Sequence, residues 1–147
     1  MYISLQTSMA LTQLSENTLR RRVADGALKF SVNTLTIELE SLKPLIRIPL
    51  DPDDTDLIGL ADKGDPSAQT YLGLLFLEND IPSGCIHWLN LASEKEFPDA
   101  MQLLGDCYLR GVGVTKDENM AIMWIAKAAS LGHVIAKAQM KGLGSRS

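Results

Sequence analysis

The chain has 147 residues, with 14 basic and 18 acidic side chains and a formal net charge of −4 at pH 7. This charge argues against general affinity for nucleic acid, and no apolar run reaches the roughly 20 residues of a membrane-spanning helix. The first residues lack a basic segment ahead of an apolar core, so we expect no signal peptide. Two cysteines are too few for a disulfide framework, which favours a reducing cytoplasm.

Charge divides the chain into two parts. Residues 1–50 carry six basic and four acidic side chains, a net charge of +2, whereas the remainder carries a net charge of −6. This asymmetry favours two modules with different partners. The acidic, proline-interrupted segment 49–56 predicts a linker between a domain at 1–48 and a domain at 57–142, with a flexible tail at 143–147.

Two short helices are predicted at the N-terminus. Residues 3–14 form an amphipathic segment, and Ser15 is placed to cap a helix over residues 16–24. Within that second helix Leu19 and Val23 lie four residues apart and therefore share one face.

A β-hairpin is predicted directly after the second helix. Apolar residues alternate at 28–32 and 35–39 around Asn33-Thr34. Helix, turn, helix and hairpin in this order resemble the winged helix-turn-helix of the excisionase and mercury-resistance-regulator type, over Leu14 to Leu28. In that class the second helix enters the major groove of DNA, and the hairpin, or wing, approaches the backbone.

The resemblance implies double-stranded DNA as one partner. Arginine binds phosphate and guanine. Specific recognition by so small a module would need either a homodimer on paired half-sites or a partner protein held by the following domain. The residues expected on DNA are Glu16, Asn17, Thr18, Arg20, Arg21 and Arg22 of the helix and Lys29 and Asn33 of the wing. The alternative to DNA binding is that the three arginines only form a solvent-exposed helix face. The N-terminal unit would then only cap the domain that follows.

Residues 103–133 hold the pattern that organises the rest of the chain. Leu104 and Tyr108 share a helix face, and Gly105 between them lets a neighbouring helix come close. Gly111 and Gly113 then break the helix, since glycine permits positive φ in a turn.

A second helix follows this turn. Asp117 is placed to cap it, and Ala121, Trp124 and Ala128 form one apolar stripe along it. The two helices therefore form a pair with small residues at the contact. A unit of this kind cannot bury its apolar face alone, which predicts further copies.

One copy lies upstream. Ala68, Leu72, Gly73, Phe76, Trp88 and Ala92 correspond to Ala100, Leu104, Gly105, Tyr108, Trp124 and Ala128. The pattern resembles the Sel-one-like (Sel1-like) repeat family, which is related to tetratricopeptide repeats. The resemblance implies a mostly α fold with an α/α solenoid over residues 57–142, and a protein or peptide partner in a polar groove. The partner-facing candidates are Gln69, Gln102, Asp106 and Arg110.

The helices of the repeats are predicted at residues 66–77, 84–93, 98–110, 116–131 and 134–140. His133 follows Gly132 as Asp65 follows Gly64, so both are expected to begin a helix.

Residues for catalysis or metal binding are sparse. Cys85, His87 and Cys107 lack a zinc-ligand spacing and a fourth ligand. Neither histidine has a nearby nucleophile with a third partner, and no phosphate-binding glycine loop follows a strand. We therefore expect a DNA-associated regulator or adaptor that is not an enzyme and has no cofactor or metal. The alternative is a protein-interaction scaffold without DNA binding.

Overall fold

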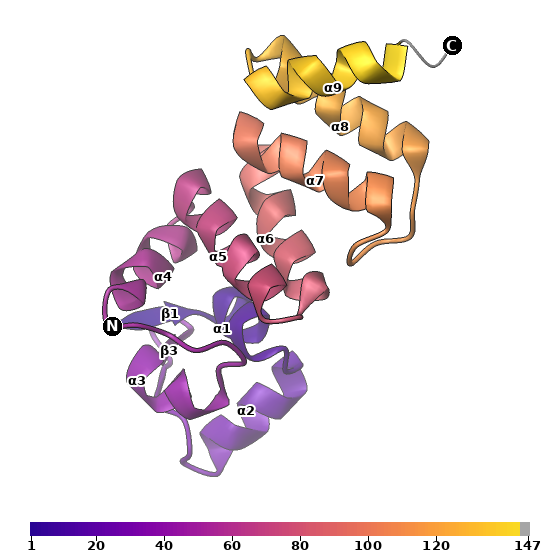
Figure 1. The fold of residues 1–147 in the computed structure, drawn as a ribbon. Coiled ribbons are helices and arrows are strands. Elements are labelled where there is room, and N and C mark those ends of the chain that lie inside the picture. Colours follow the sequence, from indigo (N-terminus) through magenta and orange to yellow (C-terminus); the bar gives the residue numbers. More distant parts are fainter. Residues whose placement is uncertain (145–147) are drawn as a thin grey trace. The chain divides into compact units, whose positions relative to one another are not determined.

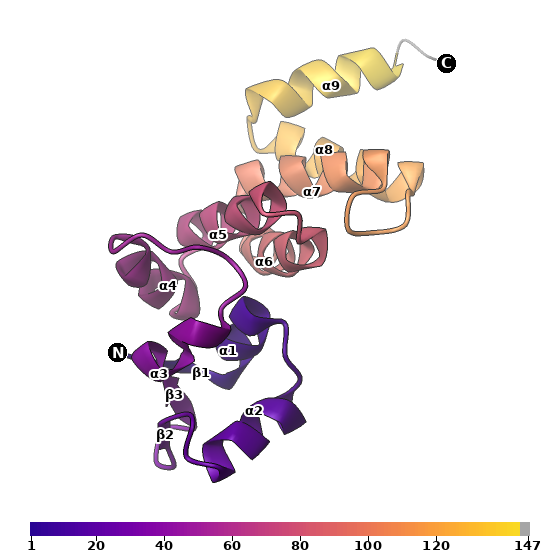
Figure 2. The ribbon, with the colours of Figure 1, turned by 60° about the horizontal axis from the view of Figure 1, so that its bottom comes forward.

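The computed structural model describes residues 1–144 and divides the chain into two compact units, Met1–Lys63 and a second that begins at Gly64. Figure 1 and Figure 2 show the elements from two directions. None of the described helices is both long and apolar enough to cross a membrane. The tail predicted at residues 143–147 lies outside the described residues except for its first two, which belong to the last helix.

The N-terminal unit combines a small sheet with short helices. The elements are β1 (Tyr2–Ser4), α1 (Leu5–Thr12), α2 (Glu16–Ala24), β2 (Phe30–Ser31), β3 (Thr36–Glu38), α3 (Leu39–Leu42), the 3-10 helix η1 (Lys43–Leu45) and α4 (Asp54–Asp62). Both β1 and β2 pair antiparallel with β3, so the strand order is β1-β3-β2. Ile3, Leu11, Leu19 and Ile37 are fully buried and form the core of this unit.

The predicted helix over residues 16–24 and the hairpin after it are confirmed. The helix predicted over residues 3–14 is wrong at its beginning, because Tyr2–Ser4 pair with Thr36–Glu38 as a strand. Ser4 instead caps α1, and its Oγ accepts a hydrogen bond from the backbone N–H of Thr7 at 3.1 Å. The assignment of this unit to the winged helix-turn-helix fold stays a prediction.

The end of α4 is fastened to the start of the chain. The carboxylate of Asp62 accepts hydrogen bonds from Ser4 Oγ at 2.6 Å, Thr7 Oγ1 at 2.6 Å and the Ser4 backbone N–H at 3.2 Å. Charge-assisted hydrogen bonds of this kind are roughly twice as strong as neutral ones. They explain why α4 belongs to the first compact unit, which extends past the linker predicted at residues 49–56.

The second unit consists of helices over its described residues. They are α5 (Pro66–Glu78), α6 (Pro82–Glu94), α7 (Pro98–Arg110), α8 (Glu118–Ser130) and α9 (Val134–Gly144). The turns follow the predicted chemistry. Asp65 and Asp117 accept from the backbone N–H three residues on, at 2.8 and 3.1 Å, and His133 Nδ1 accepts from Ala136 N at 3.2 Å. Gly111 and Gly113 have φ of +71° and +72°.

The two helix pairs approach closely at equivalent glycines, as predicted. A Cβ atom on Gly105 of α7 would lie 2.6 Å from Cγ1 of Ile125 and 3.1 Å from the carbonyl oxygen of Ala121, both on α8. A Cβ atom on Gly73 of α5 would lie 3.3 Å from the carbonyl oxygen of Cys85 on α6. Each glycine therefore lets the second helix of its pair pack against the backbone of the first.

The tryptophans at equivalent positions differ in burial. Trp88 is fully buried, whereas Trp124 is half-buried and has the Lys127 ammonium 5.2 Å from its ring centroid. The correspondence of these two positions in the repeat pattern therefore does not extend to equal burial.

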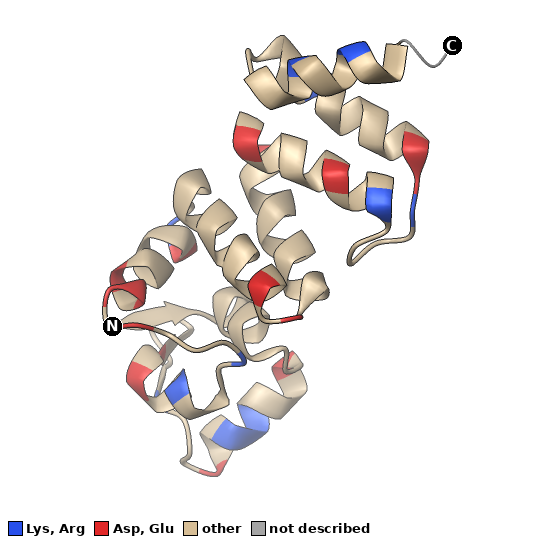
Figure 3. Cartoon of the chain, viewed as in Figure 1, with Lys and Arg blue, Asp and Glu red and all other residues tan. Residues whose placement is uncertain are grey.

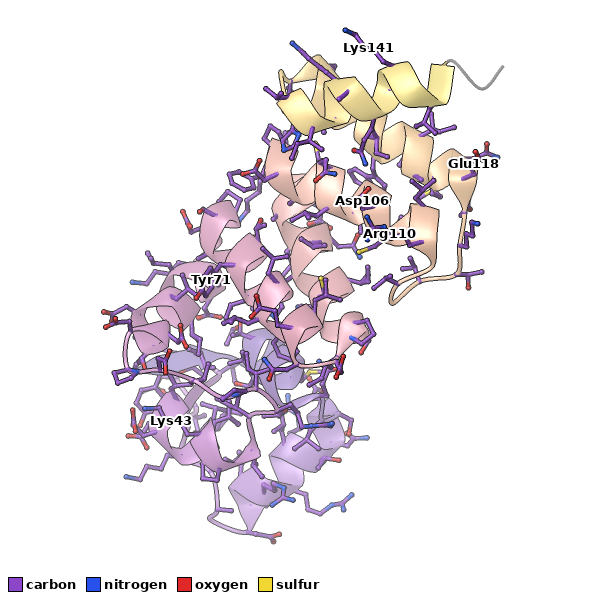
Figure 4. The ribbon with its side chains drawn as sticks, in the orientation of Figure 1. Lys43, Tyr71, Asp106, Arg110, Glu118 and Lys141 are labelled. Atoms are coloured by element: carbon purple, nitrogen blue, oxygen red, sulfur yellow. The ribbon has the colours of Figure 1, made fainter. Side chains whose placement is uncertain are left out.

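Helix α9 repeats only part of the pattern. Ala136 is fully buried, as are Ala68 and Ala100 at the equivalent positions of α5 and α7. Lys141, however, stands where α5 and α7 have Gly73 and Gly105. Its side chain is exposed and points away from α8 (Figure 4).

Candidate functional site

The candidate site is an apolar hollow of about 120 Å³ between α5, α6 and α7. The glycine contact at Gly73 holds α5 and α6 close together, and α7 packs against α6 on the same side. The lining residues are Leu74 and Leu77 of α5, Cys85 and Leu89 of α6, Leu103, Asp106, Cys107 and Arg110 of α7, and Val112 of the following turn. Most of this surface is aliphatic, and the charged groups in it are Asp106 and Arg110.

The turn after α7 completes the hollow. Its Gly113 packs against the start of α6, and a Cβ atom there would lie 2.6 Å from the carbonyl oxygen of Pro82. Positive φ and lack of space both require glycine at this position. The turn thereby holds Val112 at the edge of the hollow.

Two thiols lie side by side in the lining. Cys85 and Cys107 are both buried and lie close enough to shift each other's pKa through a side-chain hydrogen bond. That hydrogen bond, together with burial, raises the pKa of Cys85 well above its usual range. The same hydrogen bond lowers the pKa of Cys107, against burial and the negative charge of Asp106, which both raise it.

Polar side chains on α7 and α9 form a network beside the hollow. Asp106 Oδ1 accepts from Gln139 Nε2 at 2.6 Å, and Asp106 Oδ2 accepts from Gln102 Nε2 at 3.1 Å. Gln102 Nε2 also donates to Gln139 Oε1 at 3.0 Å. The network fastens α9 to α7. Figure 4 shows Asp106 and Arg110 near each other on α7.

The four residues predicted to face a partner differ in accessibility. Gln69 and Gln102 are only 3% and 5% exposed, which leaves their side chains little surface for another molecule. Asp106 is half-buried and Arg110 is exposed. The structure therefore brings Asp106 and Arg110 together at the hollow. Gln102 instead donates hydrogen bonds to Asp106 and Gln139 within the unit.

Sequence reasoning missed the leucines of the hollow and Gln139. The leucines follow the apolar spacing of ordinary core residues, so no local signal distinguishes them. Gln139 had one signal, because it stands on α9 where α7 has Leu103, and a polar residue at that position breaks the repeat pattern.

The residues predicted to bind DNA lie on the surface of the N-terminal unit. Arg20, Arg21 and Arg22 are exposed on α2, where Figure 3 shows a group of basic residues. Arg20 lies 3.6 Å from Glu16 in an ion pair, and Lys29 lies 3.6 Å from Glu38. Glu16, Asn17, Arg20, Arg21, Arg22, Lys29 and Asn33 are exposed, and Thr18 is half-buried.

The remaining candidates for site residues are metal ligands and the histidine on α6. No group of three or more histidine, cysteine, aspartate or glutamate side chains within residues 1–144 is arranged to hold a metal ion. His87 packs edge-on to Trp88, with ring centroids 5.2 Å apart, and burial lowers its pKa.

Comparison with known proteins identifies the helix pairs. Residues 66–97 and 98–133 each match the Sel1 repeat. The first repeat contains α5 and α6, and the second contains α7 and α8. The match does not extend to the N-terminal unit, and the search of curated proteins gives no match.

Two solved structures share the repeat fold. One is a protective antigen present in uropathogenic Escherichia coli strains and displaying an SLR fold, with 34% identity and a TM-score of 0.60 over 63% of this chain. The other is a Sel1 repeat protein from Oxalobacter formigenes, with 29% identity and a TM-score of 0.57 over 60% of this chain. The chain covers only 21% and 38% of these proteins.

Proposed function

We propose that this chain, through its two Sel1 repeats, is a protein-interaction module without catalytic activity. Repeats of this kind build extended surfaces for partner proteins. The observation that carries the proposal is the aliphatic hollow between α5, α6 and α7, with Arg110 at its rim.

The size of the hollow favours a protein partner over a small-molecule substrate. Pockets for small molecules usually measure roughly 300–1,000 Å³, and the hollow has about 120 Å³. A cavity of about 150 Å³ lined by aliphatic residues accommodates benzene. The hollow therefore suits one aliphatic side chain of a larger partner.

Substitution of a hollow residue tests the proposal. Leu77 lines the hollow and is 36% exposed, and Met123 on α8 is equally exposed but does not line it. The full chain would be immobilised and exposed to an extract of its own cells, and captured proteins would be identified by mass spectrometry. We expect Leu77→Arg to lose partners that the wild type and the control Met123→Arg retain. Identical capture by all three chains would contradict a partner site at the hollow.

Duplex DNA is a second candidate partner. It is favoured by the three exposed arginines on α2, directly ahead of the β2–β3 hairpin. The ion pairs of Arg20 and Lys29 with carboxylates weaken this case, because they compensate part of the basic charge.

Fluorescence anisotropy with a mixed-sequence duplex at low salt tests DNA binding. Binding should weaken with salt, with a logarithmic slope of about −0.9 per contacted phosphate, and should disappear when Arg20, Arg21 and Arg22 are changed to Ala. If the wild-type chain does not bind the duplex, the alternative function remains, which is a protein-interaction scaffold that does not bind DNA. The proposals of a regulatory role and of a homodimer on paired half-sites both depend on this result, because both presuppose DNA binding. The cytoplasm stays the proposed location.

A further inference from the structure

The two charged groups at the hollow differ in their hydrogen bonds. Asp106 accepts from Gln139 and Gln102 through its two oxygens, as described above. Arg110, one helical turn further on, is exposed and forms no ion pair with any residue in the part of the chain that the structure describes. The aspartate is thus bound within the unit, and the arginine is left for another molecule.

The surroundings of Arg110 suit the binding of a carboxylate. The guanidinium offers five N–H donors in a planar arrangement that matches both oxygens of a carboxylate. It stands beside aliphatic groups, among them Leu103 and Val112. A carboxylate placed there would be partly removed from water, where attraction between charges is stronger than in bulk solvent.

We propose that the hollow receives an aliphatic side chain from an extended segment of a partner protein, and that Arg110 binds an aspartate or glutamate two residues away in that segment. This inference rests on the proposed function. An extended segment fits because its side chains two residues apart point to the same face, roughly 6.5–7 Å apart, so one can enter the hollow while the other meets Arg110 in its lining. The charge of Arg110, unpaired within the described residues, favours this partner over an uncharged apolar one, and the Asp106 carboxylate in the same lining is already held by two amide donors.

Blocked pentapeptides test the inference in isolation. The isotope-labelled full chain would be titrated, with amide chemical shifts as the readout, with acetyl-Gly-Leu-Gly-Asp-Gly-amide and with the same peptide carrying Asn for Asp. A third peptide with Gly in place of Leu tests the aliphatic anchor. We expect the Asp peptide to shift amides between Leu103 and Val112 and to bind about three- to fivefold more tightly than the Asn peptide, as for a partly exposed ion pair.

Arg110→Gln should remove the preference for Asp over Asn and leave the effect of Leu in place. Lys137→Gln is the matched control, because Lys137 is an exposed cation of the same unit that does not line the hollow. It should retain the preference.

Several outcomes would overturn the inference. Equal binding of the Asp and Asn peptides, or a preference that survives Arg110→Gln, would exclude the role of Arg110 and leave the proposed function standing. Loss of the Leu requirement would exclude the aliphatic anchor. Shifts of the same amides on raising the protein concentration alone would place a second copy in the hollow. The proposed function fails separately, when Leu77→Arg retains every captured partner.

Discussion

Replacement of Gly105 by alanine tests the close approach of α7 and α8. The new Cβ would stand 2.6 Å from Cγ1 of Ile125, which is fully buried, and 3.1 Å from the backbone oxygen of Ala121. Overpacking of this kind costs about 1–3 kcal/mol. Alanine regains about 1 kcal/mol of helix propensity over glycine, so the net loss in the free energy of unfolding should reach up to about 2 kcal/mol.

Alanine substitutions at two other helical glycines allow the effect at Gly105 on the free energy of unfolding to be compared. A Cβ atom on Gly142 of α9 meets nothing within 4 Å, so Gly142→Ala should raise the free energy of unfolding by up to about 1 kcal/mol. At Gly73 the nearest atom would be 3.3 Å away, so Gly73→Ala should fall between the two. From the most to the least stable variant, the expected order is therefore Gly142→Ala, Gly73→Ala and Gly105→Ala.

Urea unfolding followed by tryptophan fluorescence measures this order. Both tryptophans, Trp88 and Trp124, belong to the second unit, so the signal reports the unit that carries the substitutions. If Gly105→Ala stabilises the unit as much as Gly142→Ala does, the helices do not approach as described.

Two further substitutions and one chemical modification test contacts described above. Asp62→Ala should lower the free energy of unfolding of the N-terminal unit by about 1–3 kcal/mol, because hydroxyl and backbone donors lose their acceptor; circular dichroism during urea unfolding measures it, and an unchanged midpoint would contradict it. Cys107 has the lower pKa and is 7% exposed against 1% for Cys85, so iodoacetamide at pH 8 should modify Cys107 first; peptide mass mapping measures the order, and earlier modification of Cys85 would contradict it. Gln139→Ala removes a donor to Asp106 and should speed hydrogen exchange in α9, with α5 unchanged as the internal reference.

The repeats were predictable because their information is local. The small residue at Gly105, the turn at Gly111 and Gly113 and the cap at Asp117 each act within one helix pair. A copy at a fixed spacing then strengthened each assignment. Strand β1 lacked such a signal, because Tyr2–Ser4 are held by residues more than thirty positions away and precede a helical pattern.

The candidate site was predictable only in part. Arg110 and Asp106 were found from their polarity on a helix expected to face a groove, and both line the hollow. Gln69 has the same polarity but is buried. Whether such a polar side chain is exposed or buried depends on the rotation of its helix about the helix axis. That rotation is set by packing against two neighbouring helices and is not encoded in one segment.

The lysine in α9 has a consequence for how any further helix could pack against it. Lys141 stands where Gly73 allows α6 to approach α5, so a helix stacked on α9 in the same way would meet a long charged side chain at its closest point. Any chain segment placed on this face would have to pack in another way. A segment on this face would therefore have to lie further from the backbone of α9 than α6 lies from that of α5.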